Sequence, residues 1–104
     1  MRQISYLPEA TFFKPQGIPL TELDRVVVSH EELEAIRLVD FLGLEQKEAA
    51  ERMDISRRSM AADLKTGRRK IADAILHGKA IAIQGGDFVY QKGSETRKIY
   101  ETEE

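Results

Sequence analysis

The clearest pattern of apolar and polar positions lies in residues 46–76. Within its first part, Ala49, Ala50 and Met53 recur at the spacing of one helical face, and the small alanines allow a second helix to cross closely. Only residues 53–55 are available for the connection that follows, which is the length of the turn in a helix-turn-helix. The pattern therefore predicts a short helix, a tight turn and a long helix.

The long helix, residues 56–76, has an apolar face and a basic face. Ser56 stands where an N-cap hydroxyl accepts a hydrogen bond from the backbone of the next turn. The apolar positions share one face and are expected to be buried: Met60, Leu64, Gly67, Ile71, Ala74 and Ile75. At about 100° per residue, the opposite face carries Arg58, Ala62, Lys65 and Arg69. Arg57, Ala61 and Arg68 follow one flank between these two faces.

A third helix is predicted ahead of these two. Residues 29–32 match a capping box, with Ser29 at the N-cap and Glu32 reaching back from the first turn. The core stripe comprises Ala35, Leu38, Val39 and Leu42, widened by Ile36 and Phe41. Gly43 is the natural end of the helix. We expect this helix to pack across the other two and complete a three-helix core.

Short β-strands are predicted near the N-terminus. Residues 4–6 and 11–13 are rich in aromatic and β-branched side chains, and we expect Tyr6, Phe12 and Phe13 to pack on the helical core rather than bind a ligand. Residues 19–23 predict a short helical turn. Residues 26–28, three valines, are either extended or a buried entry into the helix that follows.

A second β-rich region follows the long helix, which should end at Gly78. Residues 80–83 and 88–90 flank Gly85 and Gly86, a pattern typical of a β-hairpin. An isolated hairpin is marginally stable, so this one should pair with the N-terminal strands or with another subunit. The expected fold is thus mainly α: a three-helix core with a helix-turn-helix, plus short terminal β-strands and a hairpin. Residues 1–92 form one domain, and residues 93–104 are expected to be a disordered acidic tail.

The charge of the chain is unevenly distributed. Residues 56–79 hold seven basic and two acidic residues, a charge of +5, which leaves −7 for the rest of a chain whose net charge is −2. An acidic body with one basic element tends to turn that element towards a polyanion. The alternative is that the basic run is only the solvated surface of a helix.

Several functional classes find no support in the residues. No run approaches the ~20 apolar residues of a membrane span, and the N-terminus lacks the apolar stretch of a signal peptide, so we expect a soluble cytoplasmic protein that does not bind membranes. There are no cysteines, and His30 and His77 have no ligand-spaced partners. We therefore expect no metal, no cofactor and no catalytic residue; the protein is not expected to be an enzyme.

Residues 46–71 resemble the helix-turn-helix of sigma factor region 4. The resemblance lies in residues 48–51 of the first helix, the turn 54–56, and residues 69–71 of the second helix. It implies that the second helix enters the major groove of DNA.

A wider resemblance covers roughly residues 6–86. The chain is similar to uncharacterised protein family 0251, also called domain of unknown function 134. The matching motifs are Tyr6-Leu7-Pro8-Glu9, Phe13-Lys14-Pro15, Gly17-Ile18-Pro19-Leu20, Glu32-Leu33-Glu34-Ala35-Ile36-Arg37-Leu38, Gly43-Leu44, Glu48-Ala49-Ala50, Ser56-Arg57 and Gly78-Lys79-Ala80. The resemblance implies a small prokaryotic protein predicted to bind DNA.

The sequence departs from the pattern of that family at three places. The N-terminal cysteines that members often carry are absent, which argues against a metal or redox role. Asp54 replaces the usual glycine of the turn, which is tolerable because aspartate visits the left-handed region. Ala61, Ala62 and Asp63 replace positions that are usually polar, basic and apolar; Asp63 would lie beside phosphates and repel them.

Double-stranded DNA is the expected partner, and the protein is expected to regulate transcription. Arg57 and Arg58 are candidates for base contacts because the N-terminal end of such a helix points into the groove, with Ser59 and Lys65 as weaker candidates. Ser56 leaves backbone N–H groups for a phosphate, and Gln46 lies where the first helix crosses the DNA backbone. Arg68, Arg69 and Lys70 are expected to hold phosphates or acidic neighbours. The candidate DNA-binding residues are Gln46, Ser56, Arg57, Arg58, Ser59, Ala62, Lys65, Arg68 and Arg69.

The few available cations predict weak binding by one copy, so we expect a homodimer joined through the terminal strands. The alternative function is a protein-interaction module without sequence-specific DNA binding, whose helices contact a protein such as RNA polymerase. The acidic remainder and Asp63 favour that alternative.

Overall fold

The computed structural model describes residues 1–92. Its elements are β1 (Arg2–Ile4), β2 (Phe12–Phe13), the 3₁₀ turn η1 (Leu20–Glu22), β3 (Arg25–Val28), α1 (His30–Ile36), the π-helical turn η2 (Arg37–Phe41), α2 (Gln46–Met53), α3 (Arg57–His77), β4 (Ala80–Ile83) and β5 (Phe88–Tyr90). The expectation of a mainly α fold with short strands is confirmed. Residues 93–104, expected to be a disordered tail, lie outside the described residues.

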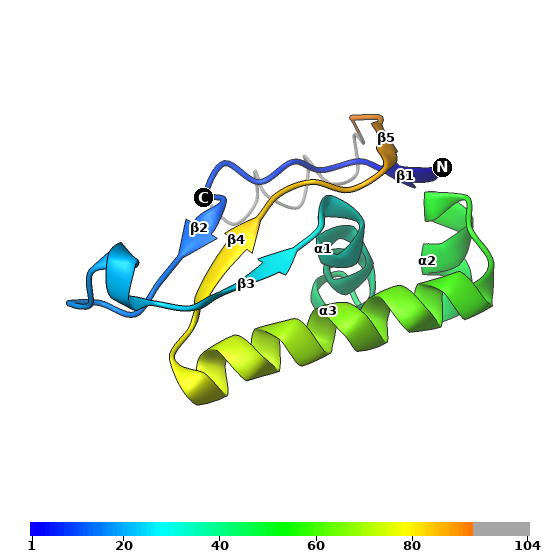
Figure 1. The fold of residues 1–104 in the computed structure, drawn as a ribbon. Coiled ribbons are helices and arrows are strands. Elements are labelled where there is room, and N and C mark those ends of the chain that lie inside the picture. Colours follow the sequence, from blue (N-terminus) through cyan, green and yellow to red (C-terminus); the bar gives the residue numbers. More distant parts are fainter. Residues whose placement is uncertain (93–104) are drawn as a thin grey trace.

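Helix α3 organises the molecule. It runs along one edge of the fold, with α1 standing on its middle and α2 beside its N-terminal part (Figure 1). The crossing of α1 over α3 is close because Gly67 lies at the contact: a Cβ atom there would be 2.9 Å from Cδ1 of Ile36 and 3.2 Å from Cβ of Glu32. The predicted burial of Gly67 is therefore confirmed, and its cause is the approach of a second helix.

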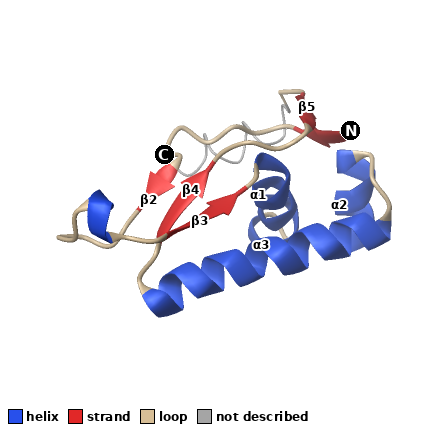
Figure 2. Cartoon of the chain, in the orientation of Figure 1, coloured by secondary structure: helices blue, strands red, loops and turns tan. Residues whose placement is uncertain are grey.

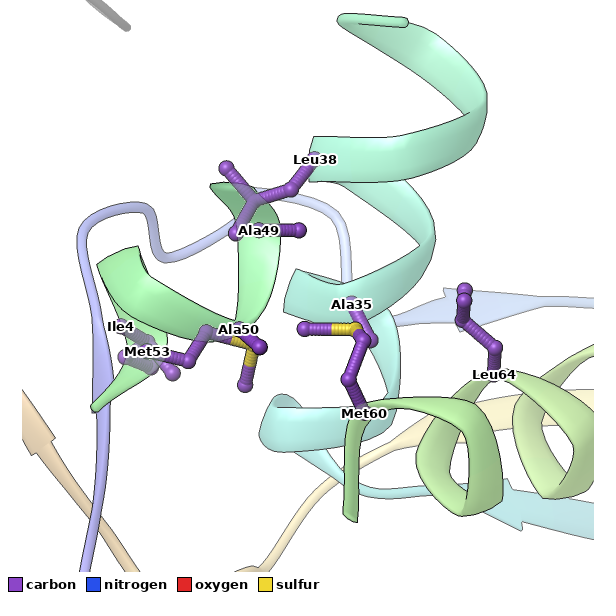
Figure 3. Packing of buried hydrophobic residues seen from close by; sticks show 8 residues of the cluster. All are labelled: Ile4, Ala35, Leu38, Ala49, Ala50, Met53, Met60 and Leu64. Atoms are coloured by element: carbon purple, nitrogen blue, oxygen red, sulfur yellow. The ribbon is translucent and has the colours of Figure 1, made fainter. Parts of the chain in front are cut away.

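The buried core joins all three helices to the N-terminal strand. Its fully buried side chains meet where α1, α2 and α3 converge (Figure 3), and they are Ile4, Ala35, Leu38, Ala49, Ala50, Met53, Met60 and Leu64. Seven of these eight belong to the helical segments and were predicted to be core positions. Ile4 is the contribution of β1, which lies against α1 and α2. The core thus fixes the orientation of α3 from its inner side.

The strands form two small sheets, shown in red in Figure 2. In the larger sheet, β4 lies between β2 and β3, antiparallel to the first and parallel to the second. In the smaller sheet, β1 and β5 pair in parallel. All three helices lie in the chain between the paired strands β3 and β4. The pairing of these two strands therefore joins the beginning and the end of the helical segment. The sequence left two alternatives for the valine run of residues 26–28, and the structure has the extended one.

The predicted hairpin of residues 80–83 and 88–90 is wrong. Both strands exist, but both edges of β4 are occupied by β2 and β3, and β5 pairs with β1 instead. Residues 84–87 therefore connect two sheets rather than two neighbouring strands. Gly86 has a φ of 112° and lies so close to Glu31 that a side chain would clash. The expectation that these strands pair with the N-terminal strands is confirmed.

The local signals that delimit the helices are confirmed. The hydroxyl of Ser29 accepts from the backbone N–H of Glu32, whose carboxylate accepts from the backbone N–H of Ser29. Asp54 adopts the left-handed conformation with a φ of 56° at the end of α2, and Gly78 ends α3 with a φ of 65°. The helical turn predicted within residues 19–23 is present as η1.

Four side chains expected in the core are exposed. Ile75 is 73% exposed because α3 extends past the core, and Phe41 is 50% exposed because it ends the π-helical turn, whose wider winding rotates it off the stripe. Phe12 and Phe13 are 37% and 52% exposed on a two-residue edge strand. The helical period gives the direction of Ile75 correctly, but no element within residues 1–92 covers any of the four side chains completely.

In the described part of the chain, no helix combines the length and the apolar character needed to cross a membrane.

Candidate nucleic-acid interface

The outward face of α3 is a basic stripe. Arg58, Lys65 and Arg69 are exposed, with the small Ala62 exposed between them. None of the three cations has an ion pair or hydrogen bond with another described residue. The side of α3 away from α1 and the sheets carries no other described element (Figure 1). This stripe, which the sequence predicted, is therefore open to a ligand over the ~17 Å of helix between Arg58 and Arg69.

The N-terminal end of α3 is held by its own cap. The hydroxyl of Ser56 accepts a hydrogen bond from the backbone N–H of Ser59 at 3.0 Å and donates to the hydroxyl of Ser59 at 3.1 Å. Arg57 and Arg58 follow this cap directly and are exposed. Ser59 is half-buried and hydrogen-bonded to Ser56. Its side chain is therefore less available to a ligand than those of the two arginines.

Helix α2 adds two exposed side chains at its first turn, Gln46 and Lys47. Gln46 was predicted as a site residue, whereas Lys47 was missed. Lys47 has no ion pair with another described residue. Lys47 could have been predicted from the sequence, because the argument that placed Gln46 near a DNA backbone applies equally to the next residue of the same helix turn.

Arg68 differs from the other predicted cations because it is already bound. Its guanidinium donates to both carboxylate oxygens of Asp40, at 3.0 and 2.6 Å. These hydrogen bonds lower the pKa of Asp40 below its ordinary value and raise the pKa of Arg68. Of the two roles predicted for Arg68, the structure provides the acidic neighbour.

Asp63, which was expected to repel phosphates if α3 enters a groove, does not lie on the open face and is paired with Arg2. Its carboxylate is only 14% exposed and accepts from Nε of Arg2 at 2.6 Å and from Nη2 of Arg2 at 3.1 Å. The hydrogen bond with Asp63 is the main cause that raises the pKa of Arg2. Asp63 therefore ties β1 to the side of α3, and Arg2 neutralises its charge.

The remaining cations of α3 and its C-terminal end also have partners. Lys70 donates to both oxygens of Glu32, at 2.9 and 3.1 Å. Asp73 accepts from Lys79 at 3.0 Å and contacts Nδ1 of His77 at 2.7 Å, and these two contacts lower the pKa of Asp73. Arg68 and Lys70, on the sides of α3, are thus neutralised, while Arg57 and the cations of the basic stripe are not.

The comparisons with known proteins identify the family. The family described as "Protein of unknown function DUF134" matches residues 1–91. This chain belongs to that family. A UPF0251 protein of Methanocella arvoryzae is 53% identical over 88 residues, covering 85% of this chain and 53% of the relative. A UPF0251 protein of Methanosarcina acetivorans is 46% identical over 101 residues, covering 97% of this chain and 90% of the relative.

The chain spans about half the length of several curated relatives it matches, including a second protein of Methanosarcina acetivorans that is 52% identical over 88 residues. No solved structure matches this chain. The resemblance to family 0251 is thereby confirmed. The names of these relatives state a family and no activity.

A buried polar cluster supports the site from behind and was not predicted. Glu34 and Arg37 are 3% and 5% exposed, and the guanidinium of Arg37 donates to both carboxylate oxygens of Glu34 at 2.8 Å. Ser5 donates its backbone N–H to Glu34 and accepts from Arg37 through its hydroxyl. The signal was a charged pair at i and i+3 inside an apolar stripe. The cluster joins the segment after β1 to the helix on which α3 rests.

The arrangement is suited to binding an anion. Within residues 1–92, no group of three or more histidine, aspartate or glutamate side chains is placed to hold a metal ion. His30 contacts the carbonyl of Gly85 through Nδ1 at 2.9 Å, and His77 contacts Asp73. The chemistry that the exposed surface offers is a row of unpaired guanidinium and ammonium groups on a rigid helix.

Proposed function

We propose that this protein binds double-stranded DNA and regulates transcription, with α2 and α3 acting as a helix-turn-helix and α3 lying in the major groove. The observation that carries the proposal is the division of the cations of α3. Within residues 1–92, Arg57 and the cations of the open face are unpaired, while Arg68 and Lys70 on its sides are bound by carboxylates. A helix fixed on one side and cationic on the other matches the ~12 Å width of the major groove.

The residues take different roles in this proposal. Arg57 and Arg58, at the N-terminal end of α3, contact base edges, where a bidentate arginine–guanine pair is worth about 1–3 kcal/mol of discrimination. The side chain of Ala62 is small, so the helix can approach the wall of the groove closely there, and its methyl group can contact a thymine methyl group. Lys65 and Arg69 hold phosphates further along the helix.

Helix α2 positions the complex on the DNA backbone. Gln46 and Lys47 lie in its first turn, where the N-terminal backbone N–H groups and the helix dipole favour a phosphate. Ser56 serves α3 in the same way, because it caps the helix with its side chain and leaves backbone groups for an anion. Arg68 contributes little as long as Asp40 holds it.

The small number of free cations supports a homodimer as the active form, which we place in the cytoplasm. The stripe, Arg57 and Lys47 neutralise only about five phosphates per copy, which gives weak and salt-sensitive binding. Two copies on half-sites one helical turn apart, about 34 Å, double the contacts and fix their spacing.

Fluorescence anisotropy with a random DNA duplex across a salt series tests the proposal. The wild-type protein should bind at low salt, and its log–log salt slope should be clearly negative. Arg57→Ala combined with Arg58→Ala should weaken binding at every salt concentration, because the variant loses the two side chains assigned to base edges and the positive charge that they bring to the groove.

The matched control is Arg25→Ala combined with Lys92→Ala, because both side chains are exposed. It removes the same charge from positions outside α2 and α3, and should leave the slope unchanged. Equal losses for both double variants would show that only net charge matters. Absence of binding at low salt, or a slope near zero, would favour the second candidate partner of these helices, a protein such as RNA polymerase.

A further inference from the structure

The two flanks of α3, on either side of the basic stripe, have opposite character. One flank carries the ion pairs of Asp63 with Arg2 and of Lys70 with Glu32. On the other flank, three large apolar side chains from three elements remain exposed: Phe13 at 52%, Phe41 at 50% and Ile75 at 73%. We call the second surface the apolar flank; it is made of Phe13, Pro15, Ile36, Phe41, Ile75 and Ile81.

The apolar flank is continuous and contains both projections and hollows. A hollow of about 220 Å³ lies between β2 and the C-terminal end of α3, where Phe13, Ile75 and Ile81 line it. A second hollow of about 270 Å³ lies between β2 and α1, where Phe13, Ile36 and Phe41 line it. Because Phe13 lines both hollows, its ring forms a ridge between them.

The rim of the apolar flank carries little unbalanced charge. Arg68 and Asp40, beside Phe41, neutralise each other through two hydrogen bonds. The ammonium of Lys14, beside Phe13, donates to the carbonyl oxygens of Pro15 and Ile18 at 3.2 and 2.8 Å. A strongly acidic or basic partner therefore finds no complementary row of charges among the described residues here, whereas a neutral apolar surface does fit.

The direction of the apolar flank relative to the basic stripe restricts the occupant further. At about 100° per residue, Ile75 lies about 100° around α3 from Arg58. If two copies pack through this flank, the two-fold axis that relates them can be parallel to the direction in which each basic stripe faces. Two copies joined there present both stripes on the same side, whereas joining through the surface opposite the stripe would turn them in opposite directions.

We propose that the apolar flank is the homodimer interface, in which the Phe13 ridge of each copy enters a hollow of the other. A two-fold interface must be self-complementary, and this flank supplies the projecting ring and the hollow on one surface. The inference deepens the proposed function, since it rests on the need for two stripes to face one DNA duplex. It replaces pairing of the terminal strands alone with a contact that also involves α3 and η2.

Sedimentation equilibrium of the full chain between about 1 and 100 μM, roughly the range in which such interfaces dissociate, is the test. The wild-type protein should dimerise. Ile75→Glu should raise the dimer dissociation constant by at least about tenfold, because it places a charge in a dry apolar contact.

Leu76→Glu is the matched control. Leu76 is the next residue of the same helix turn and 76% exposed, but the helical period directs it to the side of the basic stripe. Both variants add the same charge near the C-terminal end of α3, and circular dichroism should report the same helix content. Leu76→Glu should leave the dissociation constant within about twofold of the wild type.

The outcomes separate this inference from the proposed function. A wild-type protein that remains monomeric throughout the range overturns the inference, and so do equal effects of Ile75→Glu and Leu76→Glu on dimerisation. Dimerisation that responds only to Ile75→Glu, without DNA binding at low salt, supports the interface and overturns the proposed function. DNA binding by a strict monomer supports the function and overturns the interface.

Discussion

Arg37 and Arg58 carry the same guanidinium group in opposite surroundings. Arg37 is 5% exposed, and both oxygens of Glu34 accept its hydrogen bonds. Arg58 is exposed and has no ion pair with another described residue. The first group is satisfied within the fold, and its removal should damage the fold. The second guanidinium group has no partner among the described residues, and its removal should cost the fold little.

The contrast extends along α3, where it divides residues that adjoin each other in the chain. Arg68 is bound by Asp40 and Arg69 is not; Asp63 is bound by Arg2, and Lys65 has no partner among residues 1–92. Charge on this helix therefore does two separate tasks, since the bound groups hold α3 in place and the unbound groups remain available to an external anion. Substitutions should separate these tasks.

The largest effect on folding is expected from Glu34→Ala. The change leaves the guanidinium of Arg37 buried without its carboxylate, so the free energy of unfolding should fall by about 3–5 kcal/mol, measured by urea denaturation. The control is Glu48→Ala, which removes an exposed partner of Arg52 3.8 Å away and should cost less than about 0.5 kcal/mol. Similar losses for the two variants would contradict the contrast between buried and exposed pairs.

A crossed result is expected from Arg69→Ala and Arg68→Ala. Arg69→Ala should reduce the magnitude of the salt slope of DNA binding by about 1 and leave the free energy of unfolding within about 0.5 kcal/mol. Arg68→Ala should leave the salt slope unchanged and lower the free energy of unfolding by up to about 1 kcal/mol, because Asp40 loses its partner. Fluorescence anisotropy measures the salt slope and urea denaturation measures the stability of both variants. A slope change for Arg68→Ala, or none for Arg69→Ala, would contradict the prediction.

Lys47→Ala and Arg58→Ala test whether the unpaired cations differ in role, with Lys47 contacting a phosphate and Arg58 a base. If Lys47 contacts a phosphate, its loss should weaken binding equally for every duplex and reduce the slope by about 1. Arg58→Ala should instead weaken binding to selected duplexes more than to random ones, because a base contact carries sequence information. Competition between a duplex selected from a random pool and an unselected duplex measures the difference, and indistinguishable variants would refute the assignment.

The smallest effect is expected from acid. The pKa of Asp40 is lowered from its ordinary 3.8 by Arg68, so this carboxylate stabilises the folded state at a pH above 3.8 and loses the contribution as the pH falls through its lowered pKa. The difference in melting temperature between the wild type and Asp40→Asn should therefore be constant from pH 7 to about 5 and close below about pH 4. A difference that persists at a pH below the lowered pKa, where the carboxyl group is protonated, would mean that the introduced amide disturbs packing instead.

The sequence predicts the local features of this fold and misses the distant ones. Ser29, Ser56 and Asp54 act on backbone groups within a few residues, so their roles can be read directly from the chain. The basic stripe follows from the helical period in the same way. By contrast, the ion pair of Arg2 with Asp63 joins residues 61 positions apart, and no local signal specifies it.

The exposed side chains show a different limit. The helical period correctly directs Ile75 away from the basic stripe, but burial also requires another element on that side, and none of the described residues supplies one. The wrong hairpin has a related cause: a Gly-Gly turn between two strands is compatible with pairing, but β4 had two other partners. Prediction failed where a distant segment decided the outcome.

The parallel pairing of β3 with β4 has a consequence for how the chain reaches this structure. Arg25 pairs with Ala80 and Val28 with Ile83, so each contact joins residues 55 positions apart and closes a loop that contains α1, η2, α2 and α3. Closing such a loop before the helices have formed is entropically costly, whereas the contacts among α1, α2 and α3 span shorter separations. We expect the helices to associate early and this pairing to come late, so that Val27→Pro accelerates unfolding far more than it slows folding.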